Sequence, residues 1–402
     1  MGSLYSYGSV GKSIFRNAHA LDRDFVPPVL QGREEEEKKL SRLWGAVLDE
    51  RPLSQVMVYG QSGCGKTAVA KSQRIELQKA AMGRGRNVRV AYVSCASNKE
   101  TGSVINVIVQ LIRRIDESID IPDRGLSLNE YYTRLWHTID SVMGHVVVVL
   151  DEIDKLSPED LNSLLYQLSR AGENEYLTKS RLVITGITNK LDIDTLYDSK
   201  VRSSFHPTNL LFNPYNAETL RSILTHRASL AFEDGVVSED ILAYLAHRSA
   251  NEHGDARLAI NLLQLAGTHA SERGAEALTM EDVSAAQAEF DRAIMLDTVE
   301  RQGIHQRLIL YALLSKPKLE TREVIREYHK LCALLSAQPM ADTRVSHTLT
   351  VLGGINLLEM SYVHRGKGGN TREIQLSPAI PRELLKELAK KEFHRTDDDD
   401  TN

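Results

Sequence analysis

A glycine-rich loop between an apolar run and a helix-forming run constrains the fold of this chain more than any other feature. Residues 56–59 are apolar and lead into the sequence GQSGCGKT over residues 60–67. This is the pattern G-x-x-x-x-G-K-[ST], placed between a predicted strand and a predicted helix over residues 67–81. The glycines let backbone N–H groups turn towards a phosphate, and the helix N-terminus adds the positive end of its dipole. The loop therefore predicts that the chain binds a nucleoside triphosphate.

Particular residues around this loop suit particular parts of a nucleotide. We expect Lys66 to reach the oxygens of the β- and γ-phosphates, and the Thr67 hydroxyl to bind Mg²⁺. Residues 25–30 contain two consecutive prolines, and an extended segment just upstream of a phosphate loop often lies over the adenine; a plain connector is the alternative. The other candidate nucleotide contacts are Val26, Gly60, Gly63, Cys64, Gly65, Ala68 and Tyr215.

A second apolar run ends in two acidic residues. Residues 145–150 are almost all valine and leucine, which is typical of a central strand buried on both faces, and Asp151 and Glu152 follow directly. Open α/β sheets bind their ligands at the carboxyl ends of the strands. We therefore expect Asp151 to hold Mg²⁺ through water and Glu152 to polarise an attacking water.

Two more polar residues are candidates for the same site. The predicted strand over residues 181–189 ends in Asn189, which is placed to orient the water near the γ-phosphate; an ordinary turn residue is the alternative. The sequence Gly254-Asp255-Ala256-Arg257 opens a predicted helix. An arginine in the first turn of that helix can fold back onto the γ-phosphate, and the alternative is a surface charge.

The order of the elements predicts an α/β fold. Predicted strands at residues 56–59, 88–94, 145–150, 181–189 and 208–212 alternate with helices, including a strongly apolar one over 101–119. Right-handed crossovers then give a parallel sheet in a three-layer arrangement. From residue 216 to about 293 the pattern is helical, with caps expected at Asn216, Ser238 and Thr279. This segment is predicted to form a helical lid.

The last part of the chain predicts a winged helix. Helices expected at residues 308–314, 324–335 and 342–352 precede two strands at 355–363 and 373–376, which flank a basic, glycine-rich tip. The third helix would enter a major groove and the wing would contact phosphates. The candidate DNA contacts are Arg344, Ser346 and His347 on the helix, with Arg365, Lys367 and Arg372 on the wing. A protein-docking module is the alternative, and the basic wing argues against it.

Length and composition agree with a multidomain globular protein. The chain has 402 residues, of which 42% are hydrophobic and 26% charged. No apolar run approaches the roughly 20 residues that span a bilayer. The three cysteines show neither metal nor disulfide spacing, so we expect the protein to be in a reducing cytoplasm. The net charge is -5, yet residues 297–395 carry an excess of basic residues, which weakly favours an anionic partner there. We expect a segment at 1–24 that is flexible until it docks, a nucleotide-binding base at 25–213, the lid at 214–296, the winged helix at 297–395 and an acidic tail at 396–402.

In combination, these motifs resemble the archaeal initiator ATPases of the origin recognition complex and cell-division-control family, within the AAA+ class. The resemblance covers nearly the whole chain and rests on GQSGCGKT, VVVVLDEID, GITN, GDAR and the winged helix, in that order. It implies an α/β P-loop AAA+ module with a helical lid and a C-terminal winged helix, using ATP or ADP and Mg²⁺. It further implies slow hydrolysis as a switch, duplex origin DNA, the MCM replicative helicase and other initiator copies as partners, and a place in the cytoplasm on the nucleoid.

Two parts of the resemblance leave alternatives open. Residues 97–130 look like the insertion with which the family also touches DNA; a packed helix of the core is the alternative. The family commonly carries an Arg-Val pair before the last strand, where this chain has Lys200-Val201-Arg202. Lysine lacks the planar fork of an arginine finger, so whether Arg202 takes that role stays open.

Two other functions are alternatives to replication initiation. The first is a nucleotide-gated regulator of transcription or transposition, which would not recruit a helicase. The second is a signalling ATPase that uses its winged helix for protein contacts, which a DNA-binding assay would separate.

Overall fold

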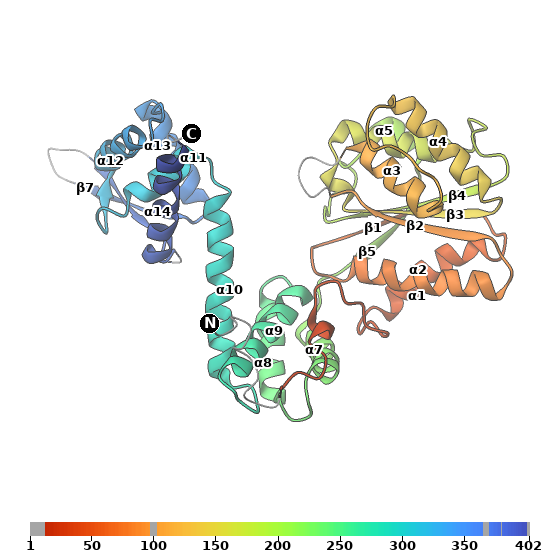
Figure 1. Ribbon diagram of the computed structural model, residues 1–402, viewed down its shortest axis with the longest axis horizontal. Coiled ribbons are helices and arrows are strands. Elements are labelled where there is room, and N and C mark those ends of the chain that lie inside the picture. The colour runs from red at the N-terminus through yellow and green to blue at the C-terminus, as the bar shows by residue number, and fades with distance from the viewer. Residues whose placement is uncertain (1–12, 97–102, 365–369, 379, 400–402) are drawn as a thin grey trace. The chain divides into compact units, whose positions relative to one another are not determined.

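The computed structural model describes residues 13–96, 103–364, 370–378 and 380–399. It divides into two compact units, residues 1–283 and 284–402, and each is described by itself. The predicted fold class is confirmed, because the first unit contains a parallel sheet and a group of helices and the second is a winged helix (Figure 1). Within the described residues, no helix is long and apolar enough to cross a membrane.

All five predicted strands of the first unit form one parallel sheet in the order β2-β3-β4-β1-β5. They are β1 (Val56–Gly60), β2 (Val88–Ser94), β3 (His145–Asp151), β4 (Arg181–Thr188) and β5 (Thr208–Phe212). Strand β3 is buried from Val146 to Asp151, as its apolar sequence predicts for a central strand. Because β4 lies between β1 and β3, the loops that follow these three strands meet at one edge of the sheet.

Helices cover both faces of this sheet (Figure 1). One face carries α1 (Glu34–Trp44) and α2 (Lys66–Gly83), and the other carries α3 (Val104–Ile115), α4 (Leu128–Ser141) and α5 (Pro158–Ser169). A short helix, α6 (Ser199–Ser204), precedes β5. Helix α3 is shorter than the predicted 101–119. It ends at Ile115 because the Asp116 carboxylate accepts hydrogen bonds from the Ser118 N–H and hydroxyl, which forms a turn in place of helix.

The helices next after the sheet are α7 (Ala217–Ala231), α8 (Glu239–Asn251), α9 (Ala256–Glu272) and α10 (Met280–Glu300). The predicted caps are confirmed, since Asn216, Ser238 and Thr279 each accept a hydrogen bond from the N–H three residues later. Helix α10 contains both residue 283, where the first unit ends, and the expected lid boundary at 296. We refer to α7, α8 and α9 as the lid.

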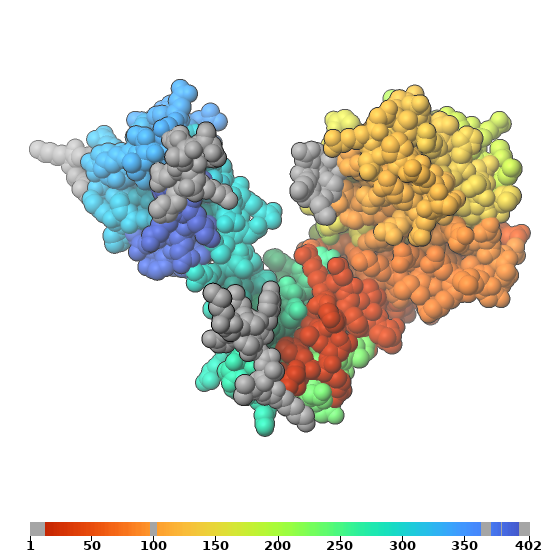
Figure 2. Space-filling view, in the orientation of Figure 1, coloured from red at the N-terminus to blue at the C-terminus, as the bar shows by residue number. Residues whose placement is uncertain are grey.

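Residues 13–24 are docked on the lid, with the short helix η2 (Ala18–Leu21) among them. The Phe15 ring stacks on Phe232 at 4.8 Å between centroids, and Ala20 and Leu21 are fully buried. Figure 2 shows this segment, in red, lying against the green lid helices. Of the segment at 1–24 that we expect to be flexible until it docks, residues 13–24 thus have a binding surface on their own chain, and residues 1–12 lie outside the described residues.

In its described residues, the second unit contains a three-stranded antiparallel sheet in the order β6-β8-β7 and four helices after α10. Its elements are α11 (Ile304–Ala312), β6 (Leu319–Glu320), α12 (Thr321–Leu334), α13 (Asp342–Gly354), β7 (Leu358–His364), β8 (Asn370–Leu376) and α14 (Arg382–Asp399). Strand β6 and helix α14 were not predicted. Helix α14 is held to α11 by a bidentate pair between Arg307 and Glu392, with N···O distances of 2.6 and 2.8 Å, and by buried leucines.

Candidate functional site

A cavity of ≈ 160 Å³ lies where the carboxyl ends of β1, β3 and β4 face the lid. Most of the predicted nucleotide-site residues line it, so the structure brings together side chains that are up to 231 positions apart in sequence. These residues are Val26, Gly63, Gly65, Lys66, Thr67, Ala68, Asp151, Glu152, Asn189, Tyr215 and Arg257. Gly60 and Cys64, which were also expected to contact a nucleotide, do not line the cavity.

Both exceptions have packing reasons. A side chain at Gly60 would meet the Phe212 carbonyl oxygen at 2.3 Å, so this glycine lies against β5. The Cys64 thiol is buried and donates to the Gln61 carbonyl at 2.8 Å, which turns it away from the cavity. These two residues lie on the side of the loop away from the cavity. Of the three loop glycines, Gly63 and Gly65 line the cavity.

Gly63 and Gly65 allow other segments to approach the loop closely. Their φ angles are +74° and +88°, which L side chains rarely adopt. A Cβ at Gly63 would lie 1.8 Å from an Asp255 carboxylate oxygen of the lid, and one at Gly65 would lie 2.3 Å from the Tyr215 hydroxyl. The loop therefore lies directly against residues at and beyond the junction of sheet and lid.

Lys66 is buried at the first turn of α2, with 6% of its surface exposed. Its ammonium donates to the carbonyls of Gly60 and Gln61 at 2.8 and 2.6 Å and to the Asn189 side-chain oxygen at 3.0 Å. Burial lowers the pKa of this lysine. Because these oxygens are uncharged, an anionic ligand would be a stronger partner for the ammonium than the groups that now surround it.

Asp151 is 4% exposed, and its carboxylate accepts three hydrogen bonds. One oxygen accepts from the Thr67 hydroxyl at 2.7 Å and from the Tyr92 hydroxyl, and the other accepts from the Glu152 N–H at 2.8 Å. Burial, followed by the charge of Asp151, raises the pKa of Tyr92. The sequence analysis did not predict Tyr92, because a tyrosine in β2 carries no signal that it faces the end of β3.

This donor set fits Mg²⁺. The Thr67 hydroxyl and the Asp151 carboxylate are adjacent hard oxygen donors, which Mg²⁺ prefers. Within the described residues, no group of three His, Cys, Asp or Glu side chains could hold a metal by itself. That also suits Mg²⁺, which commonly takes one or two protein ligands together with water and substrate phosphates.

Glu152 and Asn189 follow neighbouring strands and are held in defined positions. Glu152 has the left-handed angles φ 55° and ψ 43°, uncommon for a residue with a side chain, and its carboxylate accepts from the Ser94 hydroxyl at 3.1 Å. Asp154 accepts from the Thr188 hydroxyl at 2.8 Å and from the Asn189 N–H at 3.1 Å. These contacts fix the backbone at the point where Glu152 and Asn189 face the cavity.

The lid contacts the phosphate loop through the start of α9. The Arg257 guanidinium donates to the Ser62 hydroxyl at 3.3 Å, and the Ala256 N–H donates to the Gly63 carbonyl at 3.3 Å. Asp255 caps the helix by accepting from the Arg257 N–H at 2.7 Å. The predicted lid arginine is thus at the loop, as its place in the first turn of a helix indicated.

The sequence analysis also missed Arg33, which is 4% exposed. Its guanidinium donates to the carbonyl of Cys64 at 2.9 Å and to that of Asn213 at 2.6 Å, and it lies 3.9 Å from the centroid of the Tyr215 ring. Arg33 therefore ties the phosphate loop to the junction between sheet and lid. Arg33 also pairs with Glu36 at 2.9 Å, but that local pair does not indicate its two other partners, which are backbone carbonyls 31 and 180 residues away.

In the second unit, helix α13 presents several polar side chains. Arg344 and His347 are exposed, and Ser346 is half-buried. Arg372 on β8 donates to the Thr350 hydroxyl of α13 at 3.2 Å, which joins the wing to this helix. The predicted wing contacts Arg365 and Lys367 lie outside the described residues.

Three protein-family models match successive parts of the chain. Residues 29–184 match the AAA ATPase domain, residues 221–288 the Cdc6 AAA+ ATPase-type lid domain, and residues 297–382 the CDC6 C-terminal winged helix domain. These matches fall on most of the sheet, on the lid and on the winged helix, in the order that the sequence predicted, and β5 lies between the first two of them.

Sequence similarity to other proteins extends over nearly the full length of the chain. The ORC1-type DNA replication protein of Desulfurococcus amylolyticus is 35% identical over 368 residues, which are 90% of this chain and 91% of that protein. That of Thermococcus kodakarensis is 32% identical, over 94% and 91% of the two chains. The chain belongs to the ORC1-type DNA replication proteins.

Solved structures agree with this family. The Aeropyrum pernix ORC1 protein, solved in complex with DNA, is 31% identical and matches with a TM-score of 0.77 over 95% of this chain and 98% of that one. The Aeropyrum pernix ORC2 protein, solved as ADPNP-ADP complexes, has a TM-score of 0.61 at 22% identity and supports the fold alone. The predicted resemblance is confirmed, and the AAA domain supports ATPase activity in general terms.

Proposed function

We propose that this protein is an ATP-binding DNA replication initiator that recognises duplex origin DNA and helps load the MCM replicative helicase. In this proposal, slow Mg²⁺-dependent ATP hydrolysis acts as a switch, in the cytoplasm on the nucleoid. The observation that carries it is the shared cavity, in which Lys66 of α2, Asp151 at the end of β3 and Asn189 after β4 face the same space as Arg257 of the lid. Membership of the ORC1-type family supports the replication role.

The proposed nucleotide contacts follow from the cavity lining. Lys66 binds β- and γ-phosphate oxygens, and the N–H groups of the loop at Gly63, Gly65 and Ala68 surround the phosphates. Thr67 and Asp151 hold Mg²⁺, which neutralises phosphate charge when bound. Val26 and Tyr215 line the same cavity and contact the rest of the nucleotide.

Hydrolysis then depends on three other side chains. Glu152, on the strained residue after β3, polarises the attacking water, and Asn189 orients it. Arg257 reaches the γ-phosphate from the lid. Arg257 also donates to the Ser62 hydroxyl of the loop. Loss of the γ-phosphate would remove one contact of this arginine and leave the contact to Ser62, which changes how the lid is held against the sheet.

The winged helix supplies the DNA contacts in this proposal. Helix α13 enters the major groove, with Arg344 offering the bidentate fork that suits guanine and with Ser346 and His347 beside it. Arg372 and the wing contact phosphates. The Aeropyrum pernix ORC1 protein has been solved in complex with DNA, which supports DNA as the partner. We further propose that the DNA is duplex and that other initiator copies bind beside this one.

Footprinting on fragments of the host genome, with and without ATP, tests this function. We expect a discrete protected site whose strength depends on ATP in the wild type and not in Lys66→Ala. Purified MCM helicase added to that complex should be retained on origin DNA. Protection without helicase retention would favour a transcriptional or transposition regulator, and the absence of any protection would contradict a DNA-binding role.

A further inference from the structure

The cavity has a wall that comes from the beginning of the chain. Residues 20–33, which we call the strap, start on the lid at η2 and end at Arg33, the residue that precedes α1. Between these points the strap supplies Phe25, Val26 and Pro27 to the cavity lining. Asp24 on the strap lies 4.0 Å from the Lys71 ammonium of α2. The strap thus passes from lid to sheet beside the cavity.

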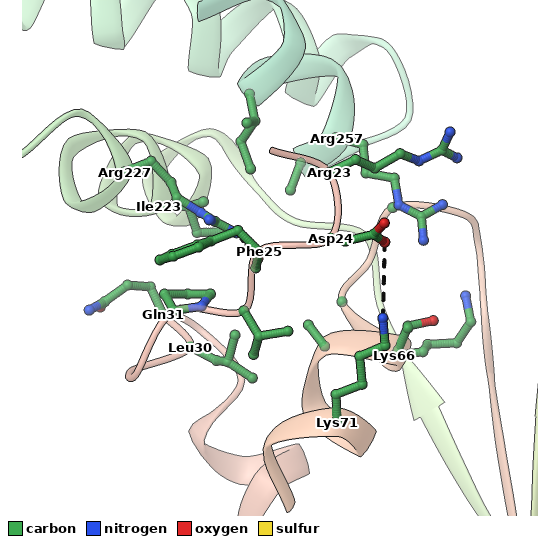
Figure 3. A pocket seen from close by; sticks show the side chains of 18 of the residues that line it. Arg23, Asp24, Phe25, Leu30, Gln31, Lys66, Lys71, Ile223, Arg227 and Arg257 are labelled. Carbon is green, nitrogen blue, oxygen red and sulfur yellow. Dashed lines mark hydrogen bonds and ion pairs between the residues drawn. The ribbon is translucent and has the colours of Figure 1, made fainter. Parts of the chain in front are cut away.

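One side chain of the lid holds the strap at its first end. Arg227 on α7 donates from one guanidinium nitrogen to the Ala20 carbonyl at 2.7 Å and from the other to the Phe25 carbonyl at 2.8 Å. Its central carbon lies 4.8 Å from the centroid of the Phe25 ring. Figure 3 shows Arg227, Phe25 and Gln31 grouped at one end of the cavity, away from Lys66 and Arg257.

The setting of Arg227 is unusual for a charged residue. It is 8% exposed, and burial lowers its pKa. In the part of the chain that the structure describes, no carboxylate forms an ion pair with it, so backbone carbonyls and an aromatic face are its main partners. Buried charges are costly unless they are hydrogen-bonded, and here the bonds all go to one short segment of backbone. The stability of this cation therefore depends on the strap being in place.

We propose that Arg227 is a positioning residue that couples binding of the nucleoside part of the ligand to the lid. By holding both Ala20 and Phe25, it fixes the apolar wall formed by Phe25, Val26 and Pro27 relative to α7. This inference rests on the proposed function, in which the cavity binds ATP. It goes beyond that function because it assigns the nucleoside end to a lid residue with no expected phosphate contact.

Two consequences distinguish this role. Without the Arg227 guanidinium, the Ala20 and Phe25 carbonyls lose their bridging donor, and the part of the strap beyond the buried Ala20 and Leu21 is no longer fixed to α7. The nucleoside then loses a fixed wall, whereas Lys66, Gly63 and Gly65 stay as they are because none of them contacts Arg227. Affinity for a nucleotide should fall while affinity for a bare phosphate chain stays constant.

The test uses the full chain with Arg227→Met, which keeps length without donors, and Arg227→Lys, which keeps charge without the fork. Arg221→Met is the matched control, because Arg221 is exposed on the same helix and pairs with Glu239. Titration calorimetry measures ATP, ADP and inorganic tripolyphosphate, and hydrogen exchange follows the peptide over residues 20–27. We expect Arg227→Met to weaken ATP and ADP about tenfold, with a smaller loss for Arg227→Lys. Tripolyphosphate should bind within about twofold of wild type, and exchange in the strap should be faster.

The other outcomes overturn the inference. Equal weakening of ATP and tripolyphosphate would mean that Arg227 acts on the whole cavity, and unchanged ATP affinity in a folded variant would mean that the strap does not depend on it. If the methionine variant fails to fold, the ratio of ATP to tripolyphosphate affinity in Arg227→Lys decides by the same criterion. A wild-type protein that binds neither ligand would instead contradict the nucleotide site, and the inference with it.

Discussion

The Thr67 hydroxyl donates a 2.7 Å hydrogen bond to Asp151, across 84 positions of sequence. This contact joins the end of the phosphate loop to the end of β3, so the two oxygen groups proposed to hold Mg²⁺ are adjacent. The Tyr92 hydroxyl donates to the same carboxylate oxygen as Thr67 does. Partners of this kind orient metal-binding carboxylates, and their loss commonly costs about 10- to 100-fold in metal affinity.

Tyr92→Phe should therefore raise the Mg²⁺ concentration that ATP binding requires by about tenfold or more. ATP binding in the absence of Mg²⁺ should stay unchanged. The phenyl ring keeps the packing of β2, and only the hydrogen bond to Asp151 is lost. Titration of Mg²⁺ at fixed labelled ATP measures the effect. Tyr244→Phe, at an exposed position on α8, is the control, and an identical Mg²⁺ curve for both variants would contradict the role given to Tyr92.

Lys66→Ala should nearly abolish tight ATP binding, because it removes the ammonium that faces the terminal phosphates. Loss of a charge-assisted contact costs about 1.5–3 kcal/mol, or roughly 10- to 150-fold in affinity. Equilibrium titration with a labelled nucleotide measures this change. Lys79→Ala lies on the same helix, is exposed, and pairs with Glu76, so it should bind as the wild type does. Unchanged affinity in Lys66→Ala would refute the phosphate-loop assignment.

Glu152→Gln should bind ATP normally and fail to hydrolyse it, since the amide keeps the shape of the carboxylate but cannot polarise water. Asp151→Asn should instead weaken Mg²⁺-dependent binding. Single-turnover release of labelled phosphate separates the two effects. Hydrolysis at the wild-type rate in Glu152→Gln would show that the roles of these neighbouring acids are wrongly assigned.

The two elements proposed to contact DNA, α13 and the wing, should respond differently to substitution. Arg344→Ala should cost about 1–3 kcal/mol on the preferred site and much less on random DNA, because a bidentate fork reads base edges. Arg372→Ala should weaken binding to all duplexes alike and lower the salt slope by about 1, as for a phosphate contact. Salt-dependent binding to a preferred and a scrambled duplex measures both. Equal losses on the two duplexes for Arg344→Ala would mean that α13 does not read bases.

Asp282 gives a pH-dependent prediction for the stability of the first unit. Arg273 donates to both of its oxygens, and these bonds, with those from Thr279, hold the pKa of the Asp282 carboxyl well below its usual range. A depressed pKa in the folded state stabilises the protein above the unfolded pKa of 3.8, and this contribution is lost as the pH falls. Asp282→Asn should cost about 1–3 kcal/mol at pH 7, and the difference from wild type should shrink below about pH 4.

Urea unfolding of Asp282→Asn and the wild type, at neutral pH and in acid, measures that difference. Glu281→Gln, the neighbouring acid in the first turn of the same helix, serves as the control for general loss of negative charge. A difference that stays constant from pH 7 to pH 3 would contradict the proposed protonation of Asp282.

The sequence predicted the fold wherever local pattern and tertiary environment agree. The apolar run at residues 145–150 could only be a buried strand, and the loop at 60–67 set the direction of the chain at the sheet edge. Because parallel strands place their carboxyl ends together, Asp151 and Asn189 could be assigned to one site before any coordinates. The two-residue strand β6 gave no such pattern. Helix α14 was not predicted, because its few apolar residues stand among many basic and acidic residues in the sequence.

The residues that escaped prediction share a kind of contact. Arg33 and Arg227 bind backbone carbonyls of remote segments, and Tyr92 meets a carboxylate on the neighbouring strand. A backbone carbonyl is the same group at every residue, so a sequence motif cannot indicate which side chain binds it. Gly60 and Cys64 are the reverse case, since they were expected at the nucleotide but do not line the cavity. A position in the motif does not reveal which atoms of the loop face the cavity.

The distance along the chain between Ala20 and Arg227 has a consequence for how the protein is made. The strap leaves the ribosome early, but its anchor on α7 follows 207 residues later. At about 5–20 residues per second, that interval is about 10–40 s. During synthesis the phosphate loop therefore emerges while the strap can form its Arg33 contact to Cys64 but still lacks its contacts to α7. The proposed nucleotide cavity is completed when the lid has been translated.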